Sequence, residues 1–138
     1  MKITAPGLEL DVSARSECTE EDWCWVHVAA DVPGFAAHFD AQLQGEDLSR
    51  FAAEVGRLQE SVGGPGTATL SSYERGLEIT LTMQRLGGIS GRYRFESERI
   101  GGDPAVLSGP FEMDQSFLPR LRDDVLNLLS ELKGANEA

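Results

Sequence analysis

Apolar and polar residues alternate at a period of two over three segments in the first third of the chain. These segments are residues 8–12, 23–32 and 35–43. A period of two places every second side chain on the same face of a sheet, so each segment is predicted to be a β-strand. Pro33 and Gly34 indicate a tight turn between the second and third strands. A type II turn fits strand twist poorly, so we expect a bulge there.

A two-residue turn also predicts which residues of the hairpin face each other. The pairs that it places opposite one another on one face are mostly aliphatic or small: Val28 with Phe39, Val26 with Ala41, Cys24 with Leu43, and Ala30 with Ala37. The other face then carries Trp23, Trp25, His27, His38, Asp40 and Gln42. This sorting is what a sheet with one buried face requires.

The period changes to that of a helix after residue 44. Gly45, Glu46 and Asp47 place two acids in the first turn, where the helix dipole favours them, and an apolar stripe then runs from Leu48 to about Ser61. The glycine- and proline-rich segment 63–66 ends this helix.

The second half of the chain predicts four more strands and a last helix. The strands are expected at residues 67–73, 77–83, 89–95 and 105–113, and their short links favour an antiparallel meander. The last helix is expected to begin near Ser116 or Leu118 because Pro119 is tolerated only in a first turn, and Gly134 suits its C-terminal end. The prediction is one α+β domain over residues 1–138. It has an antiparallel sheet of about seven strands in the order βββαββββα, two helices packed on it, and a frayed tail at 134–138. The sequence shows no internal repeat.

The charge of the chain narrows the classes of partner. Asp and Glu number 23 against 12 Lys and Arg, which gives a net charge of −11. Such a field repels nucleic acid and anionic membranes and attracts basic proteins, so neither nucleic acid nor a membrane is predicted as a partner. The chain starts without an apolar leader and has no run of about 18 apolar residues, which predicts a cytoplasmic protein. In that compartment Cys18 and Cys24 are expected to be small core residues with reduced thiols.

An acidic segment and two tryptophans form the candidate partner interface. Glu17, Glu20, Glu21 and Asp22 lie within six residues, in a spacing that fits no EF-hand loop. This segment is either a solvated loop or a docking site for a basic partner. Trp23 and Trp25 share a strand face, where they either anchor an interface or lie in the core under a helix.

Catalytic and metal-binding patterns are weak in this sequence. His27, His38 and Asp40 are a conceivable metal trio, but a surface histidine–aspartate pair is the commoner arrangement. The glycine-rich pieces match neither a P-loop nor a dinucleotide-binding fingerprint, and no nucleophile elbow or Cys–His pair is present. The sequence therefore predicts no catalytic residue, no metal site and no cofactor.

Four short motifs resemble those of WapI-like bacterial immunity proteins. They are Trp25-Val26-His27-Val28, Val32-Pro33-Gly34-Phe35, Asp47-Leu48-Ser49-Arg50-Phe51 and Asp114-Gln115-Ser116-Phe117-Leu118-Pro119. The resemblance implies a cytoplasmic, non-enzymatic antitoxin that masks the effector domain of a secreted toxin. It assigns no functional residue, and we expect Asp114 or Ser116 to cap the last helix.

The predicted function is therefore that of a binding protein that neutralises a toxin domain, for which the charge favours a basic one, as a monomer or a homodimer. The interface would comprise Glu17, Glu20, Glu21, Asp22, Trp23 and Trp25. One alternative is an acidic secretion-type chaperone or adaptor that dimerises and exposes an apolar groove. Another is a small enzyme or ligand binder built on His27, His38 and Asp40.

Overall fold

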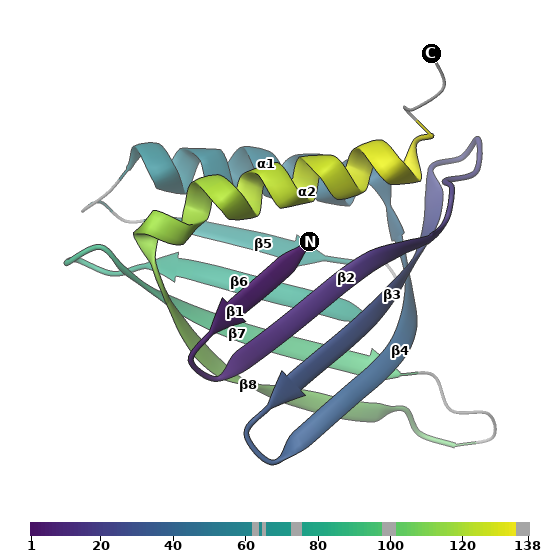
Figure 1. The fold of residues 1–138 in the computed structure, drawn as a ribbon, viewed down its shortest axis with the longest axis horizontal. Coiled ribbons are helices and arrows are strands. Elements are labelled where there is room, and N and C mark those ends of the chain that lie inside the picture. Colours follow the sequence, from purple (N-terminus) through teal and green to yellow (C-terminus); the bar gives the residue numbers. More distant parts are fainter. Residues whose placement is uncertain (62–63, 65, 73–75, 98–101, 135–138) are drawn as a thin grey trace.

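The computed structural model describes residues 1–61, 64, 66–72, 76–97 and 102–134. In this part of the chain, eight strands form two four-stranded antiparallel sheets, and two helices accompany them. The first sheet has the order β1-β2-β3-β4 and the second has the order β5-β6-β7-β8. Both helices run side by side across one end of the pair of sheets (Figure 1). The class is α+β, as the sequence predicts.

The hairpin between β3 (Trp23–Val32) and β4 (Phe35–Gln44) has the register that the sequence predicts. Val28 lies opposite Phe39, and Cys24 lies opposite Leu43. Gly34 has a φ of 85°, the sign that the second central residue of a type II turn requires. The bulge expected at this turn is wrong, because all ten residue pairs of the hairpin follow one register. An irregularity instead separates Ala14 and Ser16 in the pairing of β2 with β3.

The prediction of a single sheet of about seven strands needs two corrections. An eighth strand, β1 (Lys2–Ala5), precedes β2 (Leu8–Ser16) and pairs with it across a turn in which Gly7 has a φ of 95°. At four residues, β1 is too short for alternation to separate it from its neighbour. The strands also divide into two sheets, because β4 continues into the first helix and does not pair with β5.

The second sheet is an antiparallel meander of β5 (Thr67–Ser71), β6 (Leu77–Met83), β7 (Gly88–Ser97) and β8 (Ala105–Asp114). This arrangement confirms the meander predicted from the short links. Strand β5 ends at Ser71, two residues before the predicted end, and Tyr73 lies outside the described residues. The expected frayed tail also falls outside them, apart from Gly134.

The two helices begin and end close to their predicted residues. Helix α1 (Gly45–Glu60) starts where the backbone N–H of Gln44 donates to the carboxylate of Asp47 at 2.9 Å. Helix α2 (Leu118–Leu132) follows a short 3-10 turn, η1 (Gln115–Phe117), and Gly134 beyond its end has a φ of 64°. The prediction that Asp114 or Ser116 caps α2 is wrong. The N-cap of this helix is Phe117, without a side-chain hydrogen bond, because Asp114 precedes η1 and Ser116 lies within it.

One continuous core joins the inner faces of both sheets to the apolar stripes of both helices. Its largest fully buried side chains are Phe51, Phe95, Ile3, Leu8, Leu43, Leu48, Leu58, Leu70, Leu77, Ile79, Leu81 and Leu118. They come from both halves of the chain, so each half covers the apolar face of the other. Neither helix in the described residues has the length and apolar character needed to cross a membrane.

The order of elements repeats even though the sequence does not. Four antiparallel strands lead into a helix in residues 2–60, and the same arrangement recurs in residues 67–132. Both helices lie at the same end of the sheets. The first residues of β4 and β8 lie at the other end, where no helix covers them (Figure 1).

Candidate partner-binding site

The acidic loop, residues 17–22, joins β2 to β3 and is closed by a disulfide. Cys18 and Cys24 are bonded to each other, so the prediction of two reduced core thiols is wrong. Cys24 is fully buried, as predicted, but Cys18 lies on the loop and is only partly buried. The spacing of six residues gave little indication of a pair. The cysteines meet because the loop turns back on itself at the start of β3.

Backbone hydrogen bonds hold the acidic loop in one conformation. The N–H of Thr19 donates to the carbonyl of Trp23 at 2.8 Å, and the N–H of Asp22 donates to the carbonyl of Thr19 at 2.9 Å. The N–H of Cys18 donates to the carbonyl of Leu132 at 2.7 Å, which ties the loop to the end of α2. The backbone of the loop is therefore held in place relative to α2, and its exposed side chains extend from a fixed main chain.

Asp22 has a structural role that the other three acids of the loop do not share. Its carboxylate accepts a hydrogen bond from Lys133 Nζ at 2.6 Å and another from the backbone N–H of Glu46 at 3.0 Å. Burial alone would raise the pKa of Asp22, but these hydrogen bonds and the charge of Lys133 outweigh it. The pKa therefore lies below its ordinary value. Asp22 thus joins the loop to α1 and to the end of α2.

The remaining three acids of the loop, Glu17, Glu20 and Glu21, are exposed to solvent. Glu17 lies against the end of α2, where its carboxylate is next to Gly134. The structure thus brings together most of the predicted interface acids on one exposed loop, while it turns Asp22 toward the helices.

Trp25 lies on the outer face of the first sheet and is 42% exposed. Its neighbours Cys24 and Val26 point to the other face and are fully buried. The alternative that a helix covers both tryptophans is wrong for Trp25, because α1 and α2 lie across the end of the sheets (Figure 1). Trp23 is half-buried beside the acidic loop. A large exposed aromatic ring therefore lies on β3, four residues after the last exposed glutamate, Glu21.

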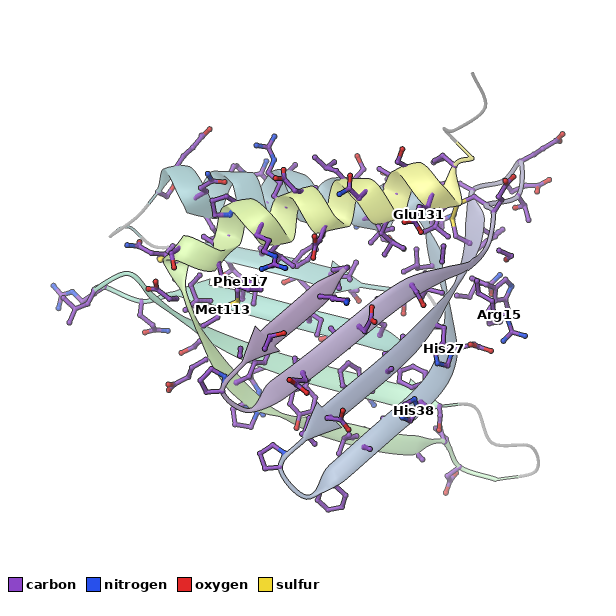
Figure 2. All side chains as sticks on the ribbon, viewed as in Figure 1. Arg15, His27, His38, Met113, Phe117 and Glu131 are labelled. Carbon is purple, nitrogen blue, oxygen red and sulfur yellow. A yellow bond between two sulfur atoms is a disulfide. The ribbon has the colours of Figure 1, made fainter. Side chains whose placement is uncertain are left out.

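The candidate metal trio forms a different kind of network. Asp40 accepts a hydrogen bond from His27 Nδ1 at 3.0 Å through one oxygen and forms an ion pair with Arg15 through the other. The rings of His27 and His38 stack with their centroids 6.3 Å apart. Arg15, His27 and His38 lie along the same side of the molecule (Figure 2). With a guanidinium on Asp40, this network is suited to holding side chains in place and poorly suited to binding a cation.

The described residues contain one cluster with metal-like spacing, formed by Cys18, Asp22 and Cys24. Its two sulfur atoms are bonded to each other in the disulfide and are not available as thiolates. The arrangement therefore closes a loop and does not suggest a metal site.

Three adjoining hollows lie beside β4. The first, of about 410 Å³, is lined mainly by apolar residues of β4 and β8, among them Phe35, Phe39 and Val106. The second, of about 350 Å³, shares Phe39 with the first and adds Trp25, Asp40 and Glu96. The third contains Trp25 and Asp40 again, together with Arg15 and Ser16. Shared lining residues place these hollows next to one another along β4, and together they are called the cleft below.

Comparison with known proteins identifies the family. The sequence profile of the WapI-like immunity protein family matches residues 2–133, nearly the whole chain. The chain belongs to this family. No curated protein matches it in sequence.

The solved structures that resemble this chain do so with low sequence identity and low TM-scores. One is the plant transcriptional regulator PBF-2, at 10% identity and a TM-score of 0.43 over 99% of this chain and 81% of that one. Another is WHY1 from Arabidopsis thaliana, at 13% identity and a TM-score of 0.41 over 99% and 92% of the two chains. A third is a DUF155-family protein of unknown function from Prochlorococcus sp. NATL2A, at 12% identity and a TM-score of 0.35 over 93% and 97%.

The candidate site consists of exposed side chains on a loop and a strand, and membership of the immunity family implies a protein partner. The acidic loop and Trp25 were found from the sequence through charge and strand periodicity. The cleft was missed, because its walls come from β4, β7 and β8, and nothing in the sequence tells how two sheets cross. In the sequence, only Phe35 and Val106 could have indicated the cleft. Both are apolar residues at strand ends, and they are 67% and 49% exposed.

Proposed function

We propose that this protein neutralises a cognate protein toxin by binding its effector domain and that it catalyses no reaction. Family membership is the observation that carries the proposal. The binding surface comprises the acidic loop and the neighbouring tryptophans, that is Glu17, Glu20, Glu21, Asp22, Trp23 and Trp25. We place this activity in the cytoplasm, where an immunity protein would meet an incoming toxin and where the Cys18–Cys24 disulfide would be exposed to reduction.

The charge of the chain favours a basic partner. At a net charge of −11, the protein attracts a cationic domain over a long range and raises the rate of encounter. Three exposed glutamates on a braced loop concentrate that field beside Trp25. The backbone hydrogen bonds of the loop hold its main chain in one conformation, so a partner would not have to order the loop backbone on binding.

The tryptophans and the glutamates would contribute in different ways. Exposed rim charges mainly change the association rate and its dependence on salt. A large ring that becomes buried at an interface contributes to the lifetime of the complex, and tryptophan is enriched among such anchors. Asp22 would contribute to the surface mainly by holding the loop to Lys133 and α1.

The direct test uses the effector domain of a secreted toxin, taken from a gene that neighbours this one where the genome carries such a gene. The two proteins are mixed, and binding is measured together with protection of cells that express the toxin. A triple variant, E17Q/E20Q/E21Q, changes the net charge from −11 to −8 by removing three charges. The matched control, D103N/E112Q/D123N, makes the same change at exposed acids elsewhere on the surface.

The loop variant is expected to slow association about tenfold or more at low salt, while the control variant slows it much less. Trp25→Ala is expected to raise the dissociation rate. A toxin domain that folds but neither binds the wild-type protein nor is neutralised by it in cells would refute the proposed function. Equal slowing by both triple variants would refute the role of the acidic loop.

The apolar hollow beside Phe35 and Val106 supports a second candidate, an acidic adaptor that dimerises. Light scattering after gel filtration separates the two. A stable dimer at micromolar concentration favours the adaptor, and a monomer that pairs with the toxin domain favours the immunity protein.

A further inference from the structure

The Cys18–Cys24 disulfide joins the acidic loop to the first sheet. Cys24 lies near the start of β3 and is fully buried, whereas Cys18 belongs to the loop and is only partly buried. The loop lies beside the C-terminal end of α2 (Figure 1). Glu20 and Glu21 lie inside the ring that the bond closes, and Glu17 directly precedes it. The state of this bond therefore bears on the three exposed acids of the proposed interface.

The other contacts that hold the loop to the helix ends are not covalent. The N–H of Cys18 donates to the carbonyl of Leu132 at 2.7 Å. The carboxylate of Asp22 accepts from Lys133 Nζ at 2.6 Å and from the backbone N–H of Glu46 at 3.0 Å. Both contacts of Asp22 are exposed to solvent, where water competes for the same groups. Without the covalent bond, the loop would therefore separate from the helix ends more often.

Asp22 has a backbone conformation that depends on its surroundings. Its φ is 68°, and no other non-glycine residue among those described has a positive φ. Such a conformation persists only where the surrounding structure enforces it, and it is frequent in segments that switch. Asp22 lies inside the ring closed by the disulfide, so opening of the ring removes one of the constraints on its φ.

The burial of the two cysteines indicates how a dithiol carrier protein, the class of reductant that acts on disulfides in the cytoplasm, would open the bond. A carrier thiolate attacks Sγ of Cys18, because Cys24 is fully buried. A bond forms between the carrier sulfur and Cys18, and the Cys18–Cys24 bond breaks. Sγ of Cys24 leaves as a thiolate and takes a proton from water. It lies 3.6 Å from the backbone carbonyl oxygen of Asp22, to which the new thiol can donate.

The second thiol of the carrier completes the reaction. It attacks the carrier sulfur of the mixed disulfide, so the carrier becomes a disulfide and Cys18 leaves as a thiolate that is then protonated. In total, two electrons and two protons pass from the carrier to the protein. The oxidised carrier runs the same exchange in the opposite direction, so the reaction is reversible.

We propose that the Cys18–Cys24 disulfide is a reversible redox switch of the acidic loop. The oxidised form holds the loop against the helix ends and binds the toxin tightly, whereas the dithiol form releases the loop and binds the toxin more weakly. This inference rests on the proposed function for the identity of the partner. An ordered loop favours binding because the partner does not have to order it. By thermodynamic linkage, a bound toxin then opposes reduction of the disulfide by the same factor.

The first measurement follows the loop without any toxin. Amide hydrogen exchange of Thr19 and Asp22, whose N–H groups donate within the loop, is compared in the oxidised and the dithiothreitol-reduced wild-type protein. Both amides are expected to exchange about tenfold faster or more after reduction. The variant C18A/C24A should resemble the reduced protein and should not respond to dithiothreitol.

Gly91→Ala is the matched control for general destabilisation. Its Cβ would meet the ring of Phe111 in the second sheet, so the fold is weakened while the disulfide stays closed. In this variant the two loop amides are expected to exchange within about threefold of their wild-type rates. Unchanged exchange after reduction overturns the inference, and so does an equal increase in Gly91→Ala.

The second measurement is the affinity of the two redox states for the toxin effector domain of the direct test. Reduction and the C18A/C24A variant are each expected to weaken binding by about tenfold. Equilibration with dithiothreitol and its disulfide should then show that saturating toxin makes the protein disulfide harder to reduce by the same factor. Tenfold corresponds to about 30 mV for this two-electron couple. A disulfide that only stabilised the fold would change neither the affinity nor this potential.

The two measurements distinguish failure of the switch from failure of the proposed function. Equal or tighter binding after reduction, with normal binding by the oxidised wild-type protein, overturns the switch and leaves the proposed function in place. If the toxin domain binds neither state, the proposed function fails. The exchange of Thr19 and Asp22 then decides by itself whether the disulfide switches the loop.

Discussion

Reduction of the Cys18–Cys24 disulfide is expected to destabilise the protein by an amount set by the loop that it closes. The bond joins residues with a sequence separation of 6, so the loop contains seven residues, from 18 to 24. It also lies where the acidic loop meets β3 and the end of α2. The perturbation is therefore local, and it acts on the segment that the proposed interface depends on.

The magnitude follows from the entropy of the unfolded chain. Closing a loop of seven residues removes about 8 cal/mol/K of chain entropy, which corresponds to about 2.3 kcal/mol at 25 °C. A protein of 138 residues unfolds with an entropy of about 290 cal/mol/K near its midpoint. Dividing the loss of about 2.3 kcal/mol by this unfolding entropy predicts a fall in Tm of about 8 °C when the disulfide is reduced.

The assay compares thermal and urea unfolding of the wild-type protein with and without a reductant, and mass spectrometry confirms the state of the two sulfurs. The variant C18A/C24A serves as a control, since it should not respond to reductant. It should lie near the reduced protein, with a small further loss because Cys24 is fully buried. An oxidised protein no more stable than its reduced form would refute the reasoning. So would a folded sample in which both thiols remain free under air.

Three further predictions concern single residues. Asp22→Asn keeps a side chain that tolerates the φ of 68° at this position but removes the charge that Lys133 meets. Because the pKa of Asp22 is lowered on folding, its contribution is complete above the ordinary value of 3.8 and is lost as the pH falls through the lowered value. The variant should therefore cost about 1 kcal/mol at neutral pH and nothing in strong acid, as measured by urea unfolding across that range. Phe51→Ala removes a fully buried ring from α1 and should lower the free energy of unfolding by about 3–5 kcal/mol in the same assay. Gly91→Ala places a Cβ inside the ring of Phe111 and should cost about 1–3 kcal/mol, part of which Phe111→Leu in the same chain should restore.

Local patterns in the sequence were sufficient to predict the elements and the β3–β4 register. That register follows from a two-residue turn together with alternation on both sides of it, and any shift by one residue would turn Val26 and Val28 to the solvent. The same logic predicted that Trp25 shares a face with polar residues. Helix α1 was equally clear, because its apolar stripe and its glycine-rich end agree with each other.

Features that depend on contacts between distant segments were not predictable in this way. Periodicity assigns a strand to a sheet only through its neighbours, so nothing local shows that β4 and β5 belong to different sheets. The disulfide was missed for the same reason. Pairing of Cys18 with Cys24 requires the loop to double back, and this depends on Asp22 meeting Lys133 and α1. The spacing of two cysteines carries no information about those partners.

The repeated arrangement of four strands and a helix explains why the protein has a cleft at all. Each half supplies one sheet and one helix, and both helices close the same end of the pair of sheets (Figure 1). Apolar residues at that end are fully buried, whereas Phe35 and Val106 at the other end of the sheets remain 67% and 49% exposed. A third layer that covered them would bury more apolar surface and stabilise the isolated protein. Under the proposed function, the exposed side chains of Phe35 and Val106 would be available to a partner that supplies the missing layer.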